Sequence, residues 1–291
     1  MKHLFLSLLT LFLLINPLIA EDKLSLVSEE NLREEYIIGD YTVKIYRDYP
    51  TGEGLLHIFK DDELVYSEKN WKFRIGHVYK QLDEISSIEI GQDITGDGES
   101  DLIVSHWSGG AHCCYSFYVF SLGEKFRFID KIEAKDSDLA KFKDINNDGI
   151  FEFAAADWNF AYWHECFAGS PAPRVILSYI DGKYKLAMDL MKKPLPSPKK
   201  EKAIIEAIQT SDRWLSKGDF WCKELETCPP SDTWGYMLEL IYTGHPEEAW
   251  NFYDKIWLED KPGKEEFLAE FKEVLAESPY WDSLKNIQGM K

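Results

Sequence analysis

Two short acidic stretches have residue types and spacing that suit a hard cation. The first, DITGDGESD, runs from Asp93 to Asp101, and the second, DINNDGIFE, runs from Asp144 to Glu152. The second follows the first by 51 residues (144 minus 93), and a strand-like segment that ends in Trp follows each. Carboxylates at positions 1, 5 and 9, with glycine at position 6 for the sharp turn, direct oxygen atoms to one point. A solvated acidic turn is the alternative, but the repeat of both spacing and following strand favours cation binding.

The pattern assigns ligands by position in the loop. Calcium takes about six to eight oxygen ligands, and a main-chain carbonyl at position 7 leaves that side chain free to vary. An EF-hand is excluded, because its position 12 needs glutamate ahead of a helix, and Val104 and Ala155 stand there. The predicted ligands of two calcium sites are Asp93, Thr95, Asp97, Glu99 and Asp101 in the first, and Asp144, Asn146, Asp148, Ile150 and Glu152 in the second.

The nine-residue form D-x-[DN]-x-D-G-x-x-[DE], leading into a strand, resembles the calcium loops of FG-GAP and VCBS-type repeats. These repeats belong to integrin-like β-propellers and related secreted proteins, and the resemblance covers roughly Ile85 to Leu186. It implies calcium held between adjacent strands of a blade in a structural role. Thr95 departs from the usual Asp or Asn, which predicts a weaker first site, and Glu152 is longer than the usual Asp.

The segment SHWSGGAHCCY, Ser105 to Tyr115, is the second candidate for chemistry. Its histidines and cysteines suit zinc or copper, or a thiolate nucleophile beside histidine, although no signature of a cysteine hydrolase is apparent. Three structural alternatives compete: a disulfide between the adjacent cysteines, pairing of one of them with Cys166, or burial of both as small residues. The residues concerned are His106, His112, Cys113 and Cys114, with His164 and Cys166 of the segment YWHEC.

The N-terminus predicts export. A basic start, an apolar run from Leu4 to Ile15 and the small Ala20 have the order of a secretory signal peptide over residues 1–20. The run is shorter than the ~20 residues of a membrane span, so no stable span is expected after cleavage. We expect a periplasmic or extracellular protein, where disulfides form, and a bond between Cys222 and Cys228.

Composition restricts the class of partner. Asp and Glu number 51 against 33 Lys and Arg, for a formal net charge of -18. This charge repels nucleic acid and anionic lipid and suits cations or basic partners. The ten Trp argue against disorder. We expect a protein or glycan partner and no nucleic acid.

The apolar pattern changes along the chain. Between Tyr41 and Asp189, alternating segments predict about three blade-like groups of strands, with hairpin turns at Asp61-Asp62 and Asp181-Gly182 and no helix. Residues 191–202, MKKPLPSPKKEK, hold three prolines and five lysines and are typical of a linker. Beyond them apolar residues recur at helical spacing.

These patterns predict an α+β multidomain protein. A signal peptide at 1–20 precedes an all-β domain at 21–190 with both calcium-type loops, then the linker at 191–202 and a small α-helical domain at 203–291. The β domain is expected to be β-propeller-like, but three blades fall short of the about four to eight of closed propellers, so the set is either incomplete or packed differently.

Residues 238–257, LELIYTGHPEEAWNFYDKIW, also resemble one tetratricopeptide-type helix pair. Arrays of that type need about three units, so an ordinary helical hairpin is the alternative. The sequence as a whole predicts an exported calcium-binding repeat protein, a structural or binding module that recognises a partner through loops of its β domain. The alternatives are a secreted hydrolase that uses the Cys/His loop and a transition-metal-handling protein.

Overall fold

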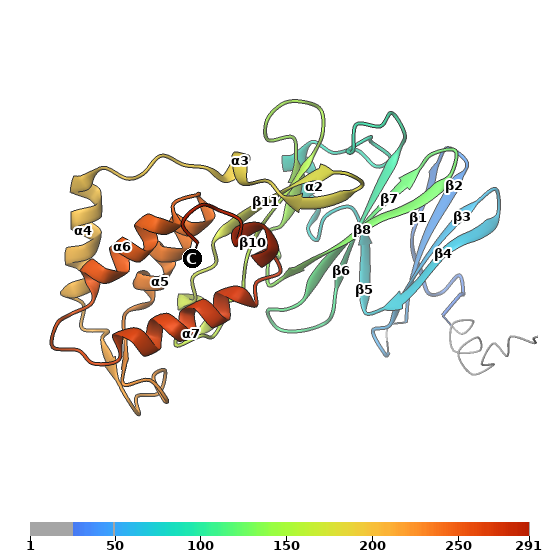
Figure 1. Cartoon of the computed structure of the whole chain (residues 1–291). Helices are drawn as coiled ribbons and strands as arrows, with labels where there is room; N and C mark the ends of the chain where they lie inside the picture. The colour runs from blue at the N-terminus through green and yellow to red at the C-terminus, as the bar shows by residue number, and fades with distance from the viewer. Residues whose placement is uncertain (1–25, 49, 291) are drawn as a thin grey trace, which may run out of the picture. The chain divides into compact units, whose positions relative to one another are not determined.

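The computed structural model describes residues 26–48 and 50–290, so the predicted signal peptide at residues 1–20 lies outside the described residues. The chain divides into two compact units, Met1–Phe73 and Arg74–Lys291. Figure 1 shows the elements in chain order from blue to red. Within the described ranges, no helix combines the length and the apolar character that crossing a membrane requires.

The first unit contains an antiparallel meander of four strands. In spatial order they are β1 (Leu32–Ile38), β2 (Tyr41–Arg47), β3 (Gly54–Lys60) and β4 (Glu63–Asn70). The predicted hairpin turn at Asp61-Asp62 is confirmed: it joins β3 to β4, with φ of 47° and 65° at the two residues. Positive φ at both central residues matches the twist of a tight hairpin. Leu26, Tyr46 and Leu55 form a small buried cluster here.

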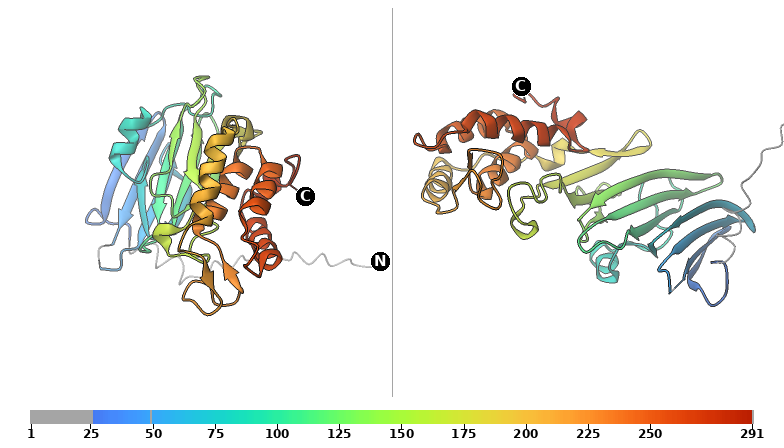
Figure 2. Two further views of the ribbon diagram at one scale, coloured as in Figure 1. Left: turned by 90° about the vertical axis from the view of Figure 1, so that its left-hand side faces the viewer. Right: turned by 90° about the horizontal axis from the view of Figure 1, so that it is seen from below.

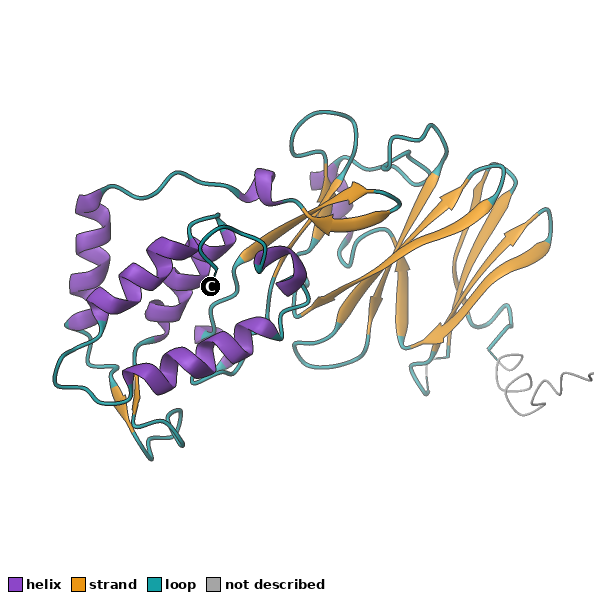
Figure 3. Ribbon diagram, in the orientation of Figure 1, coloured by secondary structure: helices purple, strands orange, loops and turns teal. Residues whose placement is uncertain are grey.

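Two further four-stranded sheets belong mainly to the second unit (Figure 3). One has the order β5-β6-β7-β8 and the other β12-β11-β10-β9. Their strands are β5 (Lys72–Ile75), β6 (Asp101–Trp107), β7 (Tyr115–Leu122), β8 (Phe126–Lys135), β9 (Lys141–Lys143), β10 (Glu152–Ala156), β11 (Arg174–Ile180) and β12 (Lys183–Leu186). The runs β6 to β8 and β9 to β12 are antiparallel, and the predicted turn at Asp181-Gly182 joins β11 to β12. The prediction of several small sheets followed by helices is confirmed at this level.

A helix between β5 and β6 corrects the prediction of an all-β segment. This helix, α2 (Lys80–Ser86), holds Asp83, whose carboxylate bonds the main-chain N–H and ring Nδ1 of His77, both at 2.8 Å, and Nη2 of Arg74 at 2.7 Å. The other ring nitrogen of His77 accepts the N–H of Phe142 in β9 at 2.8 Å. A helix of one to two turns is unstable alone. Tertiary bonds therefore hold α2, which is why its local pattern did not reveal it.

The C-terminal part is helical, as predicted. Its elements are α3 (Met188–Met191), α4 (Pro198–Gln209), β13 (Leu215–Ser216), β14 (Thr227–Cys228), α5 (Ser231–Tyr242), α6 (Pro246–Ile256), α7 (Lys264–Ala276) and α8 (Trp281–Leu284). In both views of Figure 2 the orange and red helices gather beside one another, and α5 packs on α6. The segment 191–202 differs from the predicted linker, because α4 begins within it. Ser197 caps that helix by accepting the Lys200 N–H, and Pro198 occupies its first turn.

The helices share a core with a strand, so they do not form the separate domain predicted at 203–291. Val175 and Ile176 of β11 lie in one buried cluster with Trp234 of α5 and Phe271 of α7. Trp163, in the long connection after β10, packs edge-on against Trp234 at 5.2 Å between ring centroids. The division between compact units accordingly falls after Phe73 and not near residue 191.

Candidate metal centre

Loop 1 (Asp93–Asp101) and loop 2 (Asp144–Glu152) each lead directly into a strand of a four-stranded sheet. Position 9 of each loop is the first residue of a strand: Asp101 begins β6 and Glu152 begins β10. The glycine at position 6 has φ of 85° in loop 1 and 89° in loop 2. A Cβ at either glycine would meet no atom within 4 Å, so the left-handed backbone, rather than lack of space, requires glycine.

Three hydrogen bonds recur at equivalent positions of the two loops. The N–H of position 6 donates to the carboxylate at position 1, that of position 7 to the carboxylate at position 5, and that of position 2 to the carboxylate at position 9. In loop 1 these are Gly98 to Asp93 (2.8 Å), Glu99 to Asp97 (3.0 Å) and Ile94 to Asp101 (2.9 Å). In loop 2 they are Gly149 to Asp144 (3.1 Å), Ile150 to Asp148 (2.8 Å) and Ile145 to Glu152 (2.9 Å). The sequence repeat is therefore also a repeat of loop conformation.

The two loops are in direct contact. The N–H of Phe151 donates to the carbonyl of Ile94 at 2.9 Å. Gly96 faces Ile150 so closely that an added Cβ would lie 2.8 Å from Cγ1 of that side chain. The side chain of Ile150 therefore packs against loop 1.

Asp101 is the buried carboxylate of loop 1, with 3% of its surface exposed. Its Oδ2 accepts from the N–H of Ile94 (2.9 Å) and from the N–H and hydroxyl of Thr95 (both 3.0 Å). Its Oδ1 has no hydrogen-bond partner among the described residues. Burial raises the pKa of Asp101 to about 6, against the opposing effect of these donors. A buried, unpartnered carboxylate oxygen is costly, and a bound cation would satisfy it.

Glu152 occupies the equivalent position in loop 2. It is 2% exposed, and burial raises its pKa. Its Oε2 accepts the N–H of Ile145 at 2.9 Å, and its Oε1 accepts the hydroxyl of Ser178 in β11 at 3.4 Å. The extra methylene of glutamate thus lets this carboxylate reach a serine of the neighbouring strand.

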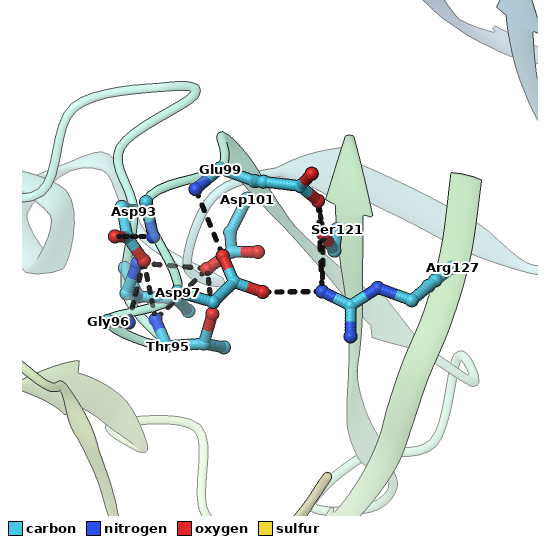
Figure 4. A network of polar contacts seen from close by, with 10 residues as sticks. Asp93, Thr95, Gly96, Asp97, Glu99, Asp101, Ser121 and Arg127 are labelled. Atoms are coloured by element: carbon cyan, nitrogen blue, oxygen red, sulfur yellow. Dashed lines mark hydrogen bonds and ion pairs between the residues drawn. The ribbon is translucent and has the colours of Figure 1, made fainter. Parts of the chain in front are cut away.

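On the exposed side of loop 1, the acidic side chains contact the guanidinium of Arg127 (Figure 4). Nη2 of Arg127, on β8, donates to Oδ2 of Asp97 and lies 3.9 Å from Oε2 of Glu99. The hydroxyl of Ser121, on β7, donates to that same Glu99 oxygen at 3.2 Å and accepts from Arg127 at 3.0 Å. Nothing in the spacing of loop 1 indicated Arg127 or Ser121. Only the register of β6, β7 and β8 brings them there.

The exposed side of loop 2 has neutral partners. Oδ2 of Asp148 accepts the side-chain amide of Asn146 at 2.8 Å, and Oδ1 of Asp148 accepts the N–H of Ile150. Hydrogen bonds thus link several of the predicted ligands within each loop, as between Thr95 and Asp101 in loop 1 and between Asn146 and Asp148 in loop 2. In the described ranges it shows no group of three or more His, Cys, Asp or Glu side chains arranged to hold a metal ion. Oδ2 of Asp93 and Oδ1 of Asp148 each accept one N–H, and because a carboxylate oxygen has two lone pairs, each keeps one for a cation.

The Cys/His segment has a disulfide at its centre. Cys113 and Cys114 are joined to each other, and the exposed Cys166 is a free thiol, so the structure agrees with the first of the three alternatives. The predicted bond between Cys222 and Cys228 is also present, with an S–S distance of 2.11 Å. While the disulfide is intact, neither Cys113 nor Cys114 offers a thiolate for catalysis or metal binding.

His112 packs on an aromatic ring, and His164 is held by hydrogen bonds. The ring of His112 stacks on Phe167, with centroids 4.3 Å apart, and Phe167 stacks in turn on Trp158 at 4.7 Å. His164 bonds Glu270 of α7 through Nε2 and the carbonyl of Trp221 through Nδ1, both at 3.0 Å. The hydrolase and transition-metal alternatives can therefore use Cys113 or Cys114 only in their reduced form, whereas Cys166 is already a free thiol.

Comparisons of the chain with protein-family models, with curated proteins and with solved structures found no match.

Proposed function

We propose that this chain is an exported calcium-binding repeat protein in which loop 1 and loop 2 each bind one calcium ion. The observation that carries the proposal is Oδ1 of Asp101, buried and without a partner among the described residues. It lies in a loop whose hydrogen bonds recur in a second copy 51 residues later (144 minus 93). A solvated acidic turn does not need a buried carboxylate.

Calcium at these positions would have a structural role. Position 9 of each loop begins β6 or β10, so an ion that binds positions 1, 5 and 9 would fix the loop against the start of a strand. Contact between the loops through Ile94 and Phe151 would join the two sheets at this point. In this interpretation the four-stranded sheets are blade-like modules, and the loops at their ends, including the segment Ser108–Cys114, present a surface to a protein or glycan partner.

Thermal unfolding of residues 21–291 tests the proposal. Two sites with Kd of about 10⁻⁴ M, in about 1 mM calcium, should raise the free energy of unfolding by roughly 3 kcal/mol relative to the same sample in chelator. For a unit of this size we expect the midpoint to rise by roughly 5–10 °C. Asp97→Asn combined with Asp148→Asn should abolish the rise.

A matched control removes two charges elsewhere. Asp61→Asn with Asp62→Asn changes an exposed turn of the first unit by the same charge, and Asn tolerates positive φ. This variant should keep the full calcium-dependent rise. Identical unfolding curves in calcium and chelator for the parent chain would refute calcium binding, and loop 1 and loop 2 would then be solvated turns.

A further inference from the structure

The two loops differ in the charge that their position-5 aspartate meets. In loop 1 both oxygens of Asp97 are engaged, one by the N–H of Glu99 and the other by the Arg127 guanidinium. In loop 2 both oxygens of Asp148 are also engaged, but by the N–H of Ile150 and the amide of Asn146. Among the described residues, a positive charge therefore meets the position-5 aspartate of loop 1 and not that of loop 2.

Strand register shows that loop 2 has an equivalent basic residue that is directed elsewhere. Asp101 pairs with Ser121 across β6 and β7, and Ser121 pairs with Arg127 across β7 and β8. In the other sheet, the carboxylate of Glu152 bonds Ser178, which pairs with Lys185 across β11 and β12.

Lys185 therefore has the place of Arg127, but its Nζ pairs with Asp181, in the β11–β12 turn, at 3.0 Å. The same position in two related sheets thus holds a cation that engages the loop in one sheet and a cation that does not in the other.

The space around Glu99 favours the arrangement in loop 1. A Cβ at Gly123 would overlap the Glu99 carboxylate, so glycine at this position lets that side chain lie over the end of β7. From there Glu99 reaches Ser121 and faces Arg127. Two carboxylates and a hydroxyl therefore hold the guanidinium beside the loop.

We propose that Arg127 is an internal competitor of calcium at loop 1, which makes loop 1 the weaker and loop 2 the tighter of the two sites. The inference rests on the proposed calcium function. For Asp97 to bind an ion as the position-5 ligand, Arg127 must leave its Oδ2, and the remaining positive charge repels the ion. The Arg127 side chain is 47% exposed and that of Asp97 30%, so the pair is weak enough for millimolar calcium to displace it.

Calcium titration of the full chain with a readout at each loop tests this inference. The amide signals of Gly98 and Gly149 in ¹H–¹⁵N spectra report on loop 1 and loop 2 separately, because each N–H bonds the position-1 carboxylate. In the parent chain, Gly149 should respond at lower calcium concentration than Gly98. The opposite order would overturn the inference without any variant.

Arg127→Gln should lower the calcium midpoint at Gly98 about fivefold, a factor that corresponds to about 1 kcal/mol, and leave Gly149 unchanged. Lys185→Gln removes the same charge from the equivalent position and should move neither midpoint. An unchanged Gly98 midpoint in Arg127→Gln, or an equal effect of Lys185→Gln, would overturn the inference while loop 2 still binds. If neither glycine responds to calcium in any chain, the proposed function itself fails.

Discussion

At the scale of single residues, the buried imidazole of His106 should make stability depend on pH. It lies on β6 with 5% of its surface exposed, and its ring meets Tyr118 edge-on. Burial lowers its pKa from 6.5 to about 4, with Lys131 acting in the same direction and Glu133 against it. The unfolded chain therefore binds the proton more tightly. The contribution of neutral His106 to the free energy of unfolding is therefore fully present above pH 6.5. It should be lost as the pH falls towards 4, by up to about 3 kcal/mol.

Urea unfolding between pH 7 and pH 4 measures this dependence. The free energy of unfolding of the parent chain should fall more steeply than that of His106→Gln, so the stability difference between them shrinks at low pH. His112→Gln, which replaces an exposed histidine, should follow the parent profile. Parallel profiles for the parent and His106→Gln would show that His106 does not carry the dependence.

The residues of the candidate site were predictable from sequence to the extent that they are local. The loop pattern correctly placed position 6 as a glycine with positive φ and position 9 at the start of a strand. It could not indicate Arg127 or Ser121, because these side chains reach loop 1 through the pairing of three strands. The orphaned oxygen of Asp101 likewise depends on burial, which a local pattern does not specify.

At the scale of elements, α2 depends on one carboxylate. Asp83 bonds the fully buried His77 ring and pairs with Arg74, and the same imidazole bonds β9. Asp83→Ala should therefore destabilise the protein by about 2–4 kcal/mol, although alanine favours helix, because the buried imidazole loses its acceptor and Arg74 keeps only the His77 carbonyl. The change is measured as the shift of the urea midpoint at pH 7.

The neighbouring Glu84 is the control for this prediction. It is exposed and lies on the same helix, so Glu84→Ala should change stability by no more than about 0.5 kcal/mol. If the two alanine variants were equally stable, the bonds of Asp83 would not be what holds α2.

Elements were predictable where one local signal dominated. The turns at Asp61-Asp62 and Asp181-Gly182 were correctly predicted, because the residue types there suit positive φ. The start of α4 was readable too, since Ser197 and Pro198 are typical of a helix N-terminus, but the density of Pro and Lys indicated a linker instead. Helix α2 could not be predicted, because its stability is tertiary.

At the scale of the whole molecule, the shared core predicts that the helices are needed for the β11 sheet to fold. Beyond the cluster around Val175 and Ile176, a buried polar link joins the two parts. Asp157, just after β10, accepts the hydroxyls of Tyr242 of α5 (2.5 Å) and Ser278 (2.6 Å). A chain that ends at Lys202 would expose the apolar face of β11 and leave the buried Asp157 without these donors.

Such a chain, ended at Lys202 inside α4, should lose cooperative thermal unfolding of the second unit and should bind a hydrophobic dye, whereas the full chain should do neither. Calcium should not rescue it, because β10 begins in loop 2 at Glu152 and pairs with β11, so loop 2 depends on the sheet that the helices cover.

Tyr242→Phe in the full chain provides the graded comparison, because it removes one donor to Asp157 and keeps the core. It should lower the free energy of unfolding by about 1–2 kcal/mol while unfolding stays cooperative. Sharp unfolding of the shortened chain, with a calcium-dependent rise equal to that of the full chain, would instead show that the boundary first predicted at residues 191–202 separates two independent domains.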